Sequence, residues 1–194
     1  LKLSASIIVL LAVYPAVCFL RERRWKQIAL FLGGGVIILL PFLARNVIIS
    51  GYLVYPFSAI DVFDVDWKMS AAMLRDDSME ITAWARGMTA RENYDAPFSF
   101  WFPEWFRSLS IGYKALFICN MACICYVFIY GIICFRRKKD MEKMQLLAVS
   151  TAGLIFWFVS APLIRYGAVY LWVLPALLSG EFCAKRKGTR LPPA

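Results

Sequence analysis

Five long uncharged stretches alternate with short charged segments along the chain. They cover residues 3–20, 27–44, 115–135, 144–164 and 166–180, and the last extends to residue 184 past a single acid at position 181. A helix rises about 1.5 Å per residue, so about 20 residues cross the ~30 Å hydrocarbon core of a bilayer. The pattern predicts an all-α integral membrane protein with about five transmembrane helices in the lipid bilayer.

The last two stretches form one apolar run, residues 144–180, whose only charge is Arg165. This run is too long for a single span, and residues 160–162 and 165–167 include a proline and a glycine, which favour a turn. We therefore expect two helices joined as a hairpin at this point.

Basic residues gather in three short segments that follow the first, third and fifth stretches. These segments hold 13 of the 22 basic residues: Arg21, Arg23, Arg24, Lys26, Arg136, Arg137, Lys138, Lys139, Lys143, Lys185, Arg186, Lys187 and Arg190. Short basic loops stay cytoplasmic. The net charge of +9 is therefore interpreted as a topology signal rather than a nucleic-acid surface, because each cluster adjoins a span.

This topology predicts four regions in a multi-pass protein of the bacterial cytoplasmic (inner) membrane. Residues 1–44 form two transmembrane helices, residues 45–112 a long extracytoplasmic loop, residues 113–184 three further transmembrane helices, and residues 185–194 a basic cytoplasmic tail. Nine of the 13 acidic residues lie between positions 51 and 112, so the loop is acidic.

The loop contains two short segments with helical signals. Asp77 and Glu80 fit a capping box that opens a helix, and Gly87 is expected to end it. Its apolar side would be formed by Ile81, Trp84, Ala85 and Met88. Residues 100–106 hold five aromatics around Pro103, which is expected at the first position of a helix. That segment is interpreted as an interfacial anchor helix, with a sugar- or headgroup-binding platform as the alternative.

Composition agrees with a membrane protein and excludes several chemistries. The chain is 61% hydrophobic and 18% charged, with a mean hydropathy of +0.62, whereas soluble domains are about half apolar and a quarter charged. It has no histidine, which excludes a Ser-His-Asp triad and a histidine-ligated metal. All six cysteines lie in or beside predicted spans and are interpreted as packing residues. They are Cys18, Cys119, Cys123, Cys125, Cys134 and Cys183.

Charged side chains at the extracytoplasmic boundary are the main candidates for chemistry. Arg45 and Arg165 either extend to the interface or hold a phosphate bidentately, and Arg165 could equally pair with a loop carboxylate such as Asp64 or Asp66. The spacing of Asp61, Asp64 and Asp66 resembles the opening of a calcium loop, but the glycine and the bidentate glutamate of such a loop are absent. The sequence therefore implies no certain cofactor and leaves a divalent metal open.

Five short motifs follow one another between residues 45 and 167. They are Arg45-Asn46-x3-Ser50-Gly51-x3-Tyr55-Pro56, Asp64-Val65-Asp66-Trp67-Lys68, Trp84-Ala85-Arg86, Trp101-x-Pro103-Glu104-Trp105 and Ala161-Pro162-x2-Arg165-Tyr166-Gly167. As an ordered set, they resemble an uncharacterised family of bacterial polytopic membrane proteins that is related to GT-C glycosyltransferases and often encoded with surface-polysaccharide genes.

The resemblance implies a membrane glycosyltransferase that uses a polyprenyl-phosphate-linked sugar in surface-polysaccharide or glycolipid synthesis. GT-C enzymes usually carry their catalytic acid in the first extracytoplasmic loop, so we expect this chain to be a C-terminal fragment whose catalytic base lies upstream. The resemblance implies substrate-binding roles for Arg45, Asn46, Tyr55, Asp64, Asp66, Trp67, Trp84, Arg86, Arg165 and Tyr166.

Two other functions are compatible with the sequence. One is a non-enzymatic component of polysaccharide export or polymerisation, such as a flippase-like transporter; the near absence of charge inside the predicted spans weighs against it. The other is a membrane anchor or assembly subunit.

Overall fold

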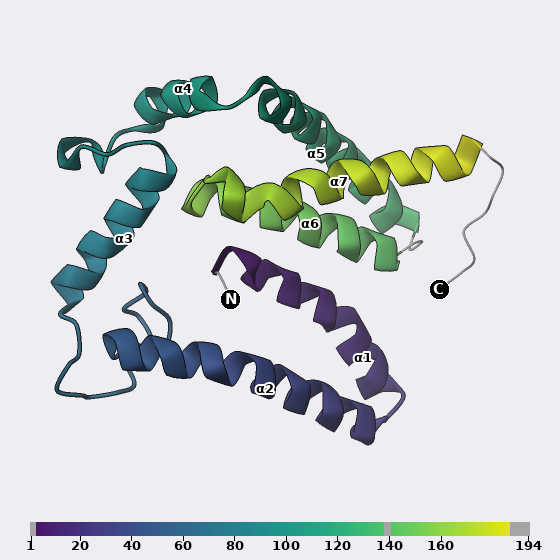
Figure 1. The fold of residues 1–194 in the computed structure, drawn as a ribbon. Coiled ribbons are helices and arrows are strands. Elements are labelled where there is room, and N and C mark those ends of the chain that lie inside the picture. Colours follow the sequence, from purple (N-terminus) through teal and green to yellow (C-terminus); the bar gives the residue numbers. More distant parts are fainter. Residues whose placement is uncertain (1–2, 138–140, 187–194) are drawn as a thin grey trace. The chain divides into compact units, whose positions relative to one another are not determined.

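The computed structural model describes residues 3–137 and 141–186, and none of these residues lies in a β-strand. Figure 1 shows the helices in chain order. They are η1 (Leu3–Ala12), α1 (Val13–Arg21), α2 (Trp25–Ser50), α3 (Ala71–Ala85), η2 (Arg91–Asn93), α4 (Phe98–Ser108), α5 (Ile111–Arg137), α6 (Met141–Ser160) and α7 (Ile164–Arg186). Lys138 and Lys139 and residues 187–194 of the predicted basic tail lie outside the described residues.

Four helices are long and apolar enough to cross a membrane, which confirms a multi-pass all-α membrane protein. They include Trp25–Ser50, Ile111–Ile133, Lys143–Ser160 and Ile164–Cys183. The first predicted span, residues 3–20, is helical along its length, but it begins as the 3₁₀ helix η1 and only then continues as α1. Its apolar helical part, Ser6–Arg21, is shorter than the other four.

Helix α2 continues to Ser50, beyond the predicted end of its span at residue 44. Arg45 and Asn46 are polar but do not stop a helix, whereas Gly51 does. Gly51 has φ 79°, a left-handed conformation that glycine adopts at little cost, and its N–H donates to the carbonyl of Val47. The loop therefore begins at Gly51.

Helix α3 begins earlier than the capping-box prediction placed it. Ser70 is the N-cap, and its hydroxyl accepts a hydrogen bond of 3.2 Å from the N–H of Met73. Asp77 lies inside the helix, so the prediction that Asp77 and Glu80 open it is wrong. Gly87, with φ 80°, follows the helix end as predicted.

The predicted apolar face of α3 is only partly right. Ala85 and Met88 are buried, as are Leu74 and Ala83, which the prediction omitted. Ile81 and Trp84 are exposed. The buried face therefore combines two small side chains, Ala83 and Ala85, with the larger Leu74 and Met88.

Helix α4 also begins earlier than predicted. Pro97 precedes its first turn and its carbonyl accepts from the N–H of Phe100, so Pro103 lies inside the helix and not at its first position. Trp101 and Trp105 are buried, whereas Phe98 and Phe100 are exposed. The aromatic segment is therefore mostly a packing element, and only its first residues present rings outward.

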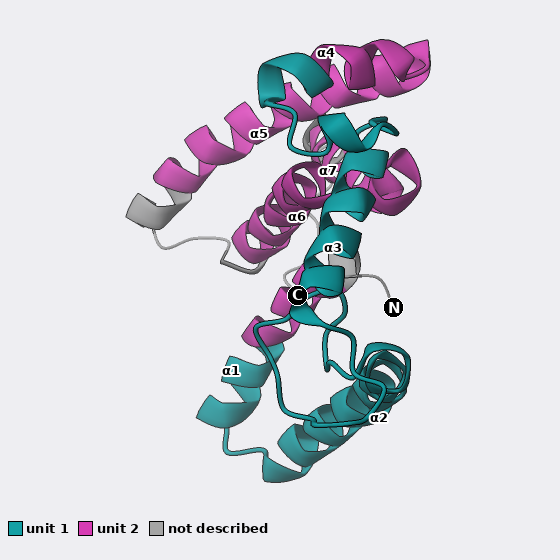
Figure 2. Ribbon diagram, turned by 90° about the vertical axis from the view of Figure 1, so that its left-hand side faces the viewer, with its two compact units in different colours: residues 1, 15–101 teal, residues 2–14, 102–194 magenta. Residues whose placement is uncertain are grey.

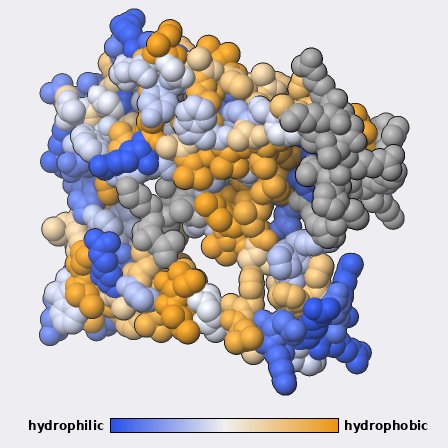
Figure 3. Space-filling model, turned by 45° about the vertical axis from the view of Figure 1, so that its right-hand side comes forward, coloured by the Kyte–Doolittle hydropathy of each residue, from blue (hydrophilic) through white to orange (hydrophobic). Residues whose placement is uncertain are grey.

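The chain divides into two compact units, which Figure 2 colours separately. The first comprises residues 15–101, with α2, α3 and the loop between them; the second comprises residues 2–14 and 102–194. In the second unit α6 packs against η1 and α7, and α5 packs against α6 and α7. The outer surfaces of the helices carry many exposed aliphatic residues, visible as large hydrophobic areas in Figure 3, as lipid-facing helices require.

The α6–α7 hairpin turns where the sequence predicted. Helix α6 ends at Ser160 and α7 begins at Ile164. The indole of Trp157 donates to the carbonyl of Leu163 at 2.9 Å, and the indole of Trp105 donates to the carbonyl of Pro162 at 2.8 Å. These two bonds satisfy carbonyls that a turn inside an apolar bundle leaves without donors.

Two glycines allow α6 and α7 to approach closely. A Cβ at Gly153 would lie 2.2 Å from the Tyr170 ring, and a Cβ at Gly167 would lie 2.2 Å from the indole of Trp157. Trp157 is fully buried and Tyr170 nearly so. Small residues at such contacts are typical of packed membrane helices.

Candidate functional site

The loop after α2 folds back onto the end of that helix. Ser50 is fully buried, and its hydroxyl donates to the carbonyl of Asn46 at 2.8 Å and accepts from the N–H of Tyr52 at 3.3 Å. The carbonyl of Ser50 accepts from the N–H of Met69 at 3.1 Å. Both ends of the loop are thus held at the last turn of α2.

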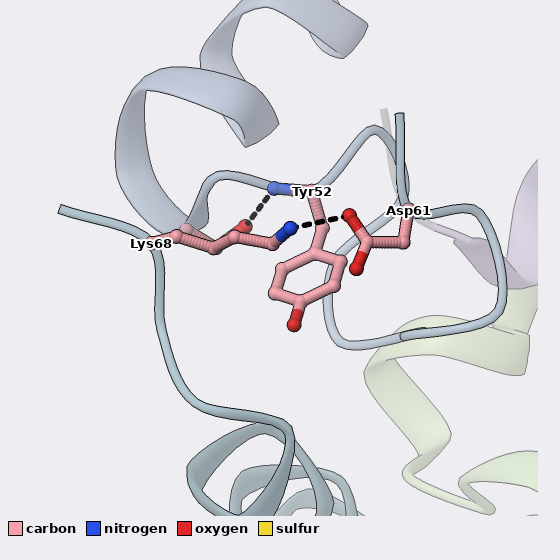
Figure 4. A network of polar contacts seen from close by, with 4 residues as sticks. Tyr52, Asp61 and Lys68 are labelled. Carbon is pink, nitrogen blue, oxygen red and sulfur yellow. Dashed lines mark hydrogen bonds and ion pairs between the residues drawn. The ribbon is translucent and has the colours of Figure 1, made fainter. Parts of the chain in front are cut away.

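Lys68 fixes the second half of the loop. Its stem packs so closely on Gly51 that a Cβ there would lie 2.8 Å from the Lys68 Cγ. Its ammonium donates to Asp61 at 2.5 Å and lies 5.2 Å from the centre of the Tyr52 ring (Figure 4). The hydrogen bond to Asp61 raises the pKa of Lys68, although desolvation opposes the rise. One side chain therefore joins α2 to both branches of the loop.

The second half of the loop presents Asp64, Asp66 and Trp67 to the outside. The N–H of Lys68 donates to the carbonyl of Val65 at 3.0 Å, so Asp66 and Trp67 are the central residues of a hydrogen-bonded turn. Trp67 is 59% exposed, and both carboxylates are exposed as well. Within residues 3–137 and 141–186, neither carboxylate takes part in a hydrogen bond or an ion pair.

Tyr55 connects the first half of the loop to α3. Its hydroxyl donates to the Asp77 carboxylate at 2.8 Å. Burial, and then the hydrogen bond and negative charge of Asp77, raise the pKa of Tyr55 to about 12. This contact gives Tyr55 a structural role that the sequence prediction did not include.

Asn46 likewise holds the loop in place. It is 7% exposed, and its side-chain amide donates to the carbonyl of Leu53 at 3.1 Å. A ligand could reach this amide only by opening the loop, so the contact favours a structural role over the predicted substrate-binding one.

Arg45 and Trp84 remain available to a ligand in this unit. Arg45 is exposed on α2, about one and a half turns before the helix ends. Among the described residues it makes no hydrogen bond or ion pair. Trp84 is 55% exposed on α3. Arg86 differs, because its guanidinium lies 4.7 Å from the centre of the Trp101 ring and burial lowers its pKa.

Arg165 and Tyr166 belong to the second unit, at the start of α7. The Arg165 guanidinium donates to the Tyr166 hydroxyl at 3.1 Å and lies 5.1 Å from the centre of its ring. Arg165 is exposed. Arg165 therefore pairs with its neighbour Tyr166. Because a guanidinium has five N–H donors, the others can still bind an anion.

A comparison with protein-family models identifies the family of this chain. Residues 1–172 match the family model described as a domain of unknown function (DUF8201). This chain belongs to the DUF8201 family. Comparisons with curated proteins and with solved structures found no match.

The described part of this DUF8201 chain contains no group of three or more His, Cys, Asp or Glu side chains that could hold a metal ion. Asp61 forms an ion pair with Lys68, whereas Asp64 and Asp66 form none among the described residues. Five of the six cysteines are free thiols, and the side chain of Cys134 lies outside the described residues.

Sequence reasoning missed the residues that shape the loop of this DUF8201 chain. Lys68 was quoted within a motif but was not a candidate, and Tyr52 and Asp61 were not linked to it. The only sequence signal was Gly51, which indicated a turn but not the side chain that covers it.

Proposed function

We propose that this DUF8201 chain forms part of a GT-C-like membrane glycosyltransferase that uses a polyprenyl-phosphate-linked sugar in surface-polysaccharide or glycolipid synthesis. The observation that carries the proposal is the turn at Asp66 and Trp67, where exposed carboxylates adjoin an exposed indole. Among the described residues, neither carboxylate forms a hydrogen bond or an ion pair that would stabilise the fold. A purely structural role for the loop therefore does not account for these exposed acids.

The chemistry of the turn suits a sugar. Ionised carboxylates accept hydrogen bonds from hydroxyl groups, and two of them, Asp64 and Asp66, can orient several hydroxyls. The flat face of Trp67 offers apolar area against the C–H face of a pyranose ring. The Lys68 contacts hold the turn in shape before any ligand binds, which lowers the entropic cost of binding.

Arg45 is proposed to bind the phosphate of the lipid-linked donor. Its guanidinium can contact phosphate oxygens bidentately, and it lies on a membrane helix just before the loop. In the reaction, an acceptor oxygen forms a bond to the anomeric carbon, the bond from that carbon to phosphate oxygen breaks, and polyprenyl phosphate leaves. The acceptor proton passes to a carboxylate base.

The proposed setting is the bacterial cytoplasmic membrane, with the loop on the extracytoplasmic side and the C-terminus in the cytoplasm. The position of the basic segments beside the spans supports this orientation. The bilayer and the lipid-linked donor are the proposed partners, and nucleic acid is not one.

The test is a deletion of the gene in its native host, complemented with wild-type protein or with the Asp64→Asn/Asp66→Asn variant. Lipid-linked intermediates are measured by mass spectrometry, and protein abundance by immunoblot. The proposal predicts that the deletion and the variant accumulate the polyprenyl-phosphate sugar donor, with the variant at normal abundance.

The alternative, a flippase-like export component, predicts a different intermediate. A transport defect accumulates the completed lipid-linked glycan and leaves the donor pool unchanged. That result, or a variant indistinguishable from wild type, would contradict the glycosyltransferase proposal.

A further inference from the structure

The short turn between α1 and α2 is strongly basic (Figure 1). Residues 21–26 include four basic side chains and one acidic side chain, and all six residues are exposed. The helix before the turn is apolar, and α2 after it is long enough to cross a membrane. A turn between two such helices lies at a membrane surface. Because the loop that starts at Gly51 lies at the other end of α2, the turn is independent of the proposed glycosyl transfer.

The backbone of the turn forms a Schellman motif at the end of α1. The N–H of Arg24 donates to the carbonyl of Phe19 at 2.9 Å, and the N–H of Arg23 donates to the carbonyl of Leu20 at 3.2 Å. Arg23 has φ 52°, the left-handed conformation that this motif requires. Glycine usually occupies this position, because a Cβ is strained there. Backbone geometry alone therefore does not account for an arginine at position 23.

Contacts on both sides of the turn fix its backbone. The rings of Phe19 and Phe31 meet edge to face, with centres 6.5 Å apart, and so join α1 to α2. The N–H of Trp25 donates to the carbonyl of Arg23 at 3.0 Å, and α2 begins at Trp25. The basic side chains therefore leave from fixed backbone positions before any ligand binds, which lowers the entropic cost of binding.

Three of the four basic side chains keep their charge for a partner. Arg24 pairs with Glu22, and the two charged atoms are 2.5 Å apart. The side chains of Arg21, Arg23 and Lys26 form no hydrogen bond or ion pair among the described residues. Like charges so close in one turn repel one another, and an anion bound among them would relieve this repulsion.

The surroundings of the turn suit a lipid. Trp25 is 66% exposed, and indoles are enriched at the boundary between headgroups and hydrocarbon. Leu20 before the turn and Leu30 after it are 53% and 76% exposed, so apolar surface continues from the turn along both helices. Positive charge beside apolar surface matches an acidic phospholipid, which has a charged headgroup and apolar chains. A soluble anion would use the charges alone.

We propose that Arg21, Arg23 and Lys26 bind the headgroup phosphate of an acidic phospholipid at the α1–α2 turn. The guanidinium groups can contact phosphate oxygens bidentately, and the ammonium of Lys26 adds a third positive charge. Each basic residue near an acidic membrane surface strengthens binding about fivefold, which corresponds to about 1 kcal/mol. Phosphatidylcholine also has a phosphate, but its choline cation offsets the charge, so the turn prefers an acidic lipid.

The first test identifies the lipid at the turn itself. A photoreactive phenylalanine analogue replaces Trp25 in the full chain, which is reconstituted in nanodiscs with equal phosphatidylglycerol and phosphatidylcholine. Adducts with the mass of phosphatidylglycerol should exceed those of phosphatidylcholine at least about fivefold. Because the adduct forms at one position, lipid bound elsewhere on the protein does not contribute. Equal adducts with both lipids, or adducts to polypeptide alone, would overturn the proposal.

Substitutions at Arg23 separate lipid binding from folding. Arg23→Gly removes the charge but suits the left-handed backbone, so its thermal stability should match or exceed that of wild type. It should lower the ratio of phosphatidylglycerol to phosphatidylcholine adducts about fivefold, whereas Arg23→Lys should retain the ratio. The control Arg75→Gln removes an exposed charge on α3 and should leave the ratio unchanged. An unchanged ratio in Arg23→Gly would contradict the proposal.

The last test distinguishes a lipid from a free anion. Phosphatidylglycerol added to the detergent-solubilised protein should raise the midpoint of thermal unfolding more in wild type than in the Arg21→Gln/Arg23→Gln/Lys26→Gln variant. Inorganic phosphate at the same concentration should raise neither midpoint. If the lipid stabilises both proteins equally, the turn is not its binding site. If phosphate alone stabilises the wild type as much as the lipid does, the turn binds a free anion and the lipid proposal fails.

Discussion

The side-chain amide of Asn120 donates a hydrogen bond of 2.9 Å to the carbonyl of Leu171. That carbonyl would normally accept from the N–H of residue 175, but position 175 is a proline and has no N–H. Asn120 is fully buried in α5, and its amide also donates to the carbonyl of Leu116 at 2.8 Å. A polar residue of one membrane helix thus satisfies a carbonyl that a proline leaves open in its neighbour.

Removing this amide should destabilise the bundle, but only while the proline is present. Asn120→Ala is expected to cost about 1 kcal/mol, since single interhelical hydrogen bonds in membranes are worth about 0.6–1.7 kcal/mol. In a Pro175→Ala background the carbonyl regains its intrahelical donor, so the same change should cost less. Thermal unfolding of the four proteins in detergent gives the coupling energy. Equal costs in both backgrounds would contradict the assignment.

The close approach of α6 and α7 should not tolerate a methyl group. Gly167→Ala places its Cβ 2.2 Å from the buried Trp157 indole, so the helices must separate, at a cost of about 1–3 kcal/mol. Gly180→Ala is the matched control on the same helix, because nothing lies within 4 Å of its added Cβ. We expect the control to match or exceed wild-type thermal stability, and a control as unstable as Gly167→Ala would refute the packing argument.

Gly51 should be more sensitive to alanine than Gly87, although both have φ near +80°. At Gly87 only backbone strain opposes the change, because no atom lies within 4 Å. At Gly51 the added Cβ also meets the stem of Lys68, so the loop must leave α2. Limited proteolysis should cut residues 52–70 faster in Gly51→Ala than in Gly87→Ala; equal cleavage would show that Lys68 does not hold the loop.

The hydroxyl of Tyr55 should lose its proton only at high pH, and its contribution to the free energy of unfolding should decrease there. Its folded-state pKa of about 12 exceeds the ordinary value of 10.0, so the folded protein holds the proton more tightly. The contribution is complete below pH 10 and is lost as pH rises through 12. The tyrosinate absorbance of wild type minus that of Tyr55→Phe should therefore rise near pH 12. A difference that rises near pH 10 would mean that Tyr55 is neither buried nor hydrogen-bonded to Asp77.

Tyr55→Phe also tests the same contact at neutral pH. Loss of the hydrogen bond to Asp77 should lower stability by about 1 kcal/mol. The deficit should shrink as pH rises from 10 to 12, which thermal unfolding across that range checks.

Hydropathy alone predicted the spans, because long uncharged runs have few other uses in a chain of this composition. The helix ends were harder to predict. Polar Arg45 suggested an early end for α2, but a helix continues through an arginine until a residue such as Gly51 takes a left-handed conformation. Asp77 suited an N-cap as well as Ser70 did, and the sequence pattern around Ser70 lacks the glutamate that completes a capping box.

Contacts between distant residues could not be predicted. Pro175 indicates that the carbonyl of Leu171 lacks a donor, but the donor, Asn120, lies 51 residues away. The structural role of Lys68 could not be predicted either, because it depends on how the loop folds back to bring Lys68 against Gly51. Asp64, Asp66 and Trp67 were candidates because they belong to a motif that carries the family resemblance. Their exposure then separated them from Asn46 and Tyr55, which hold the loop in place.

The central claim is that the turn at Asp66 acts on a sugar and does not merely support the fold. The most direct measurement is surface glycan per molecule of protein in the native host carrying Asp66→Asn. Asp95→Asn is the control, since Asp95 is also exposed and also makes no hydrogen bond or ion pair among the described residues. The account predicts at least tenfold less glycan with Asp66→Asn at unchanged abundance, and wild-type glycan with Asp95→Asn. Wild-type glycan with Asp66→Asn would contradict it.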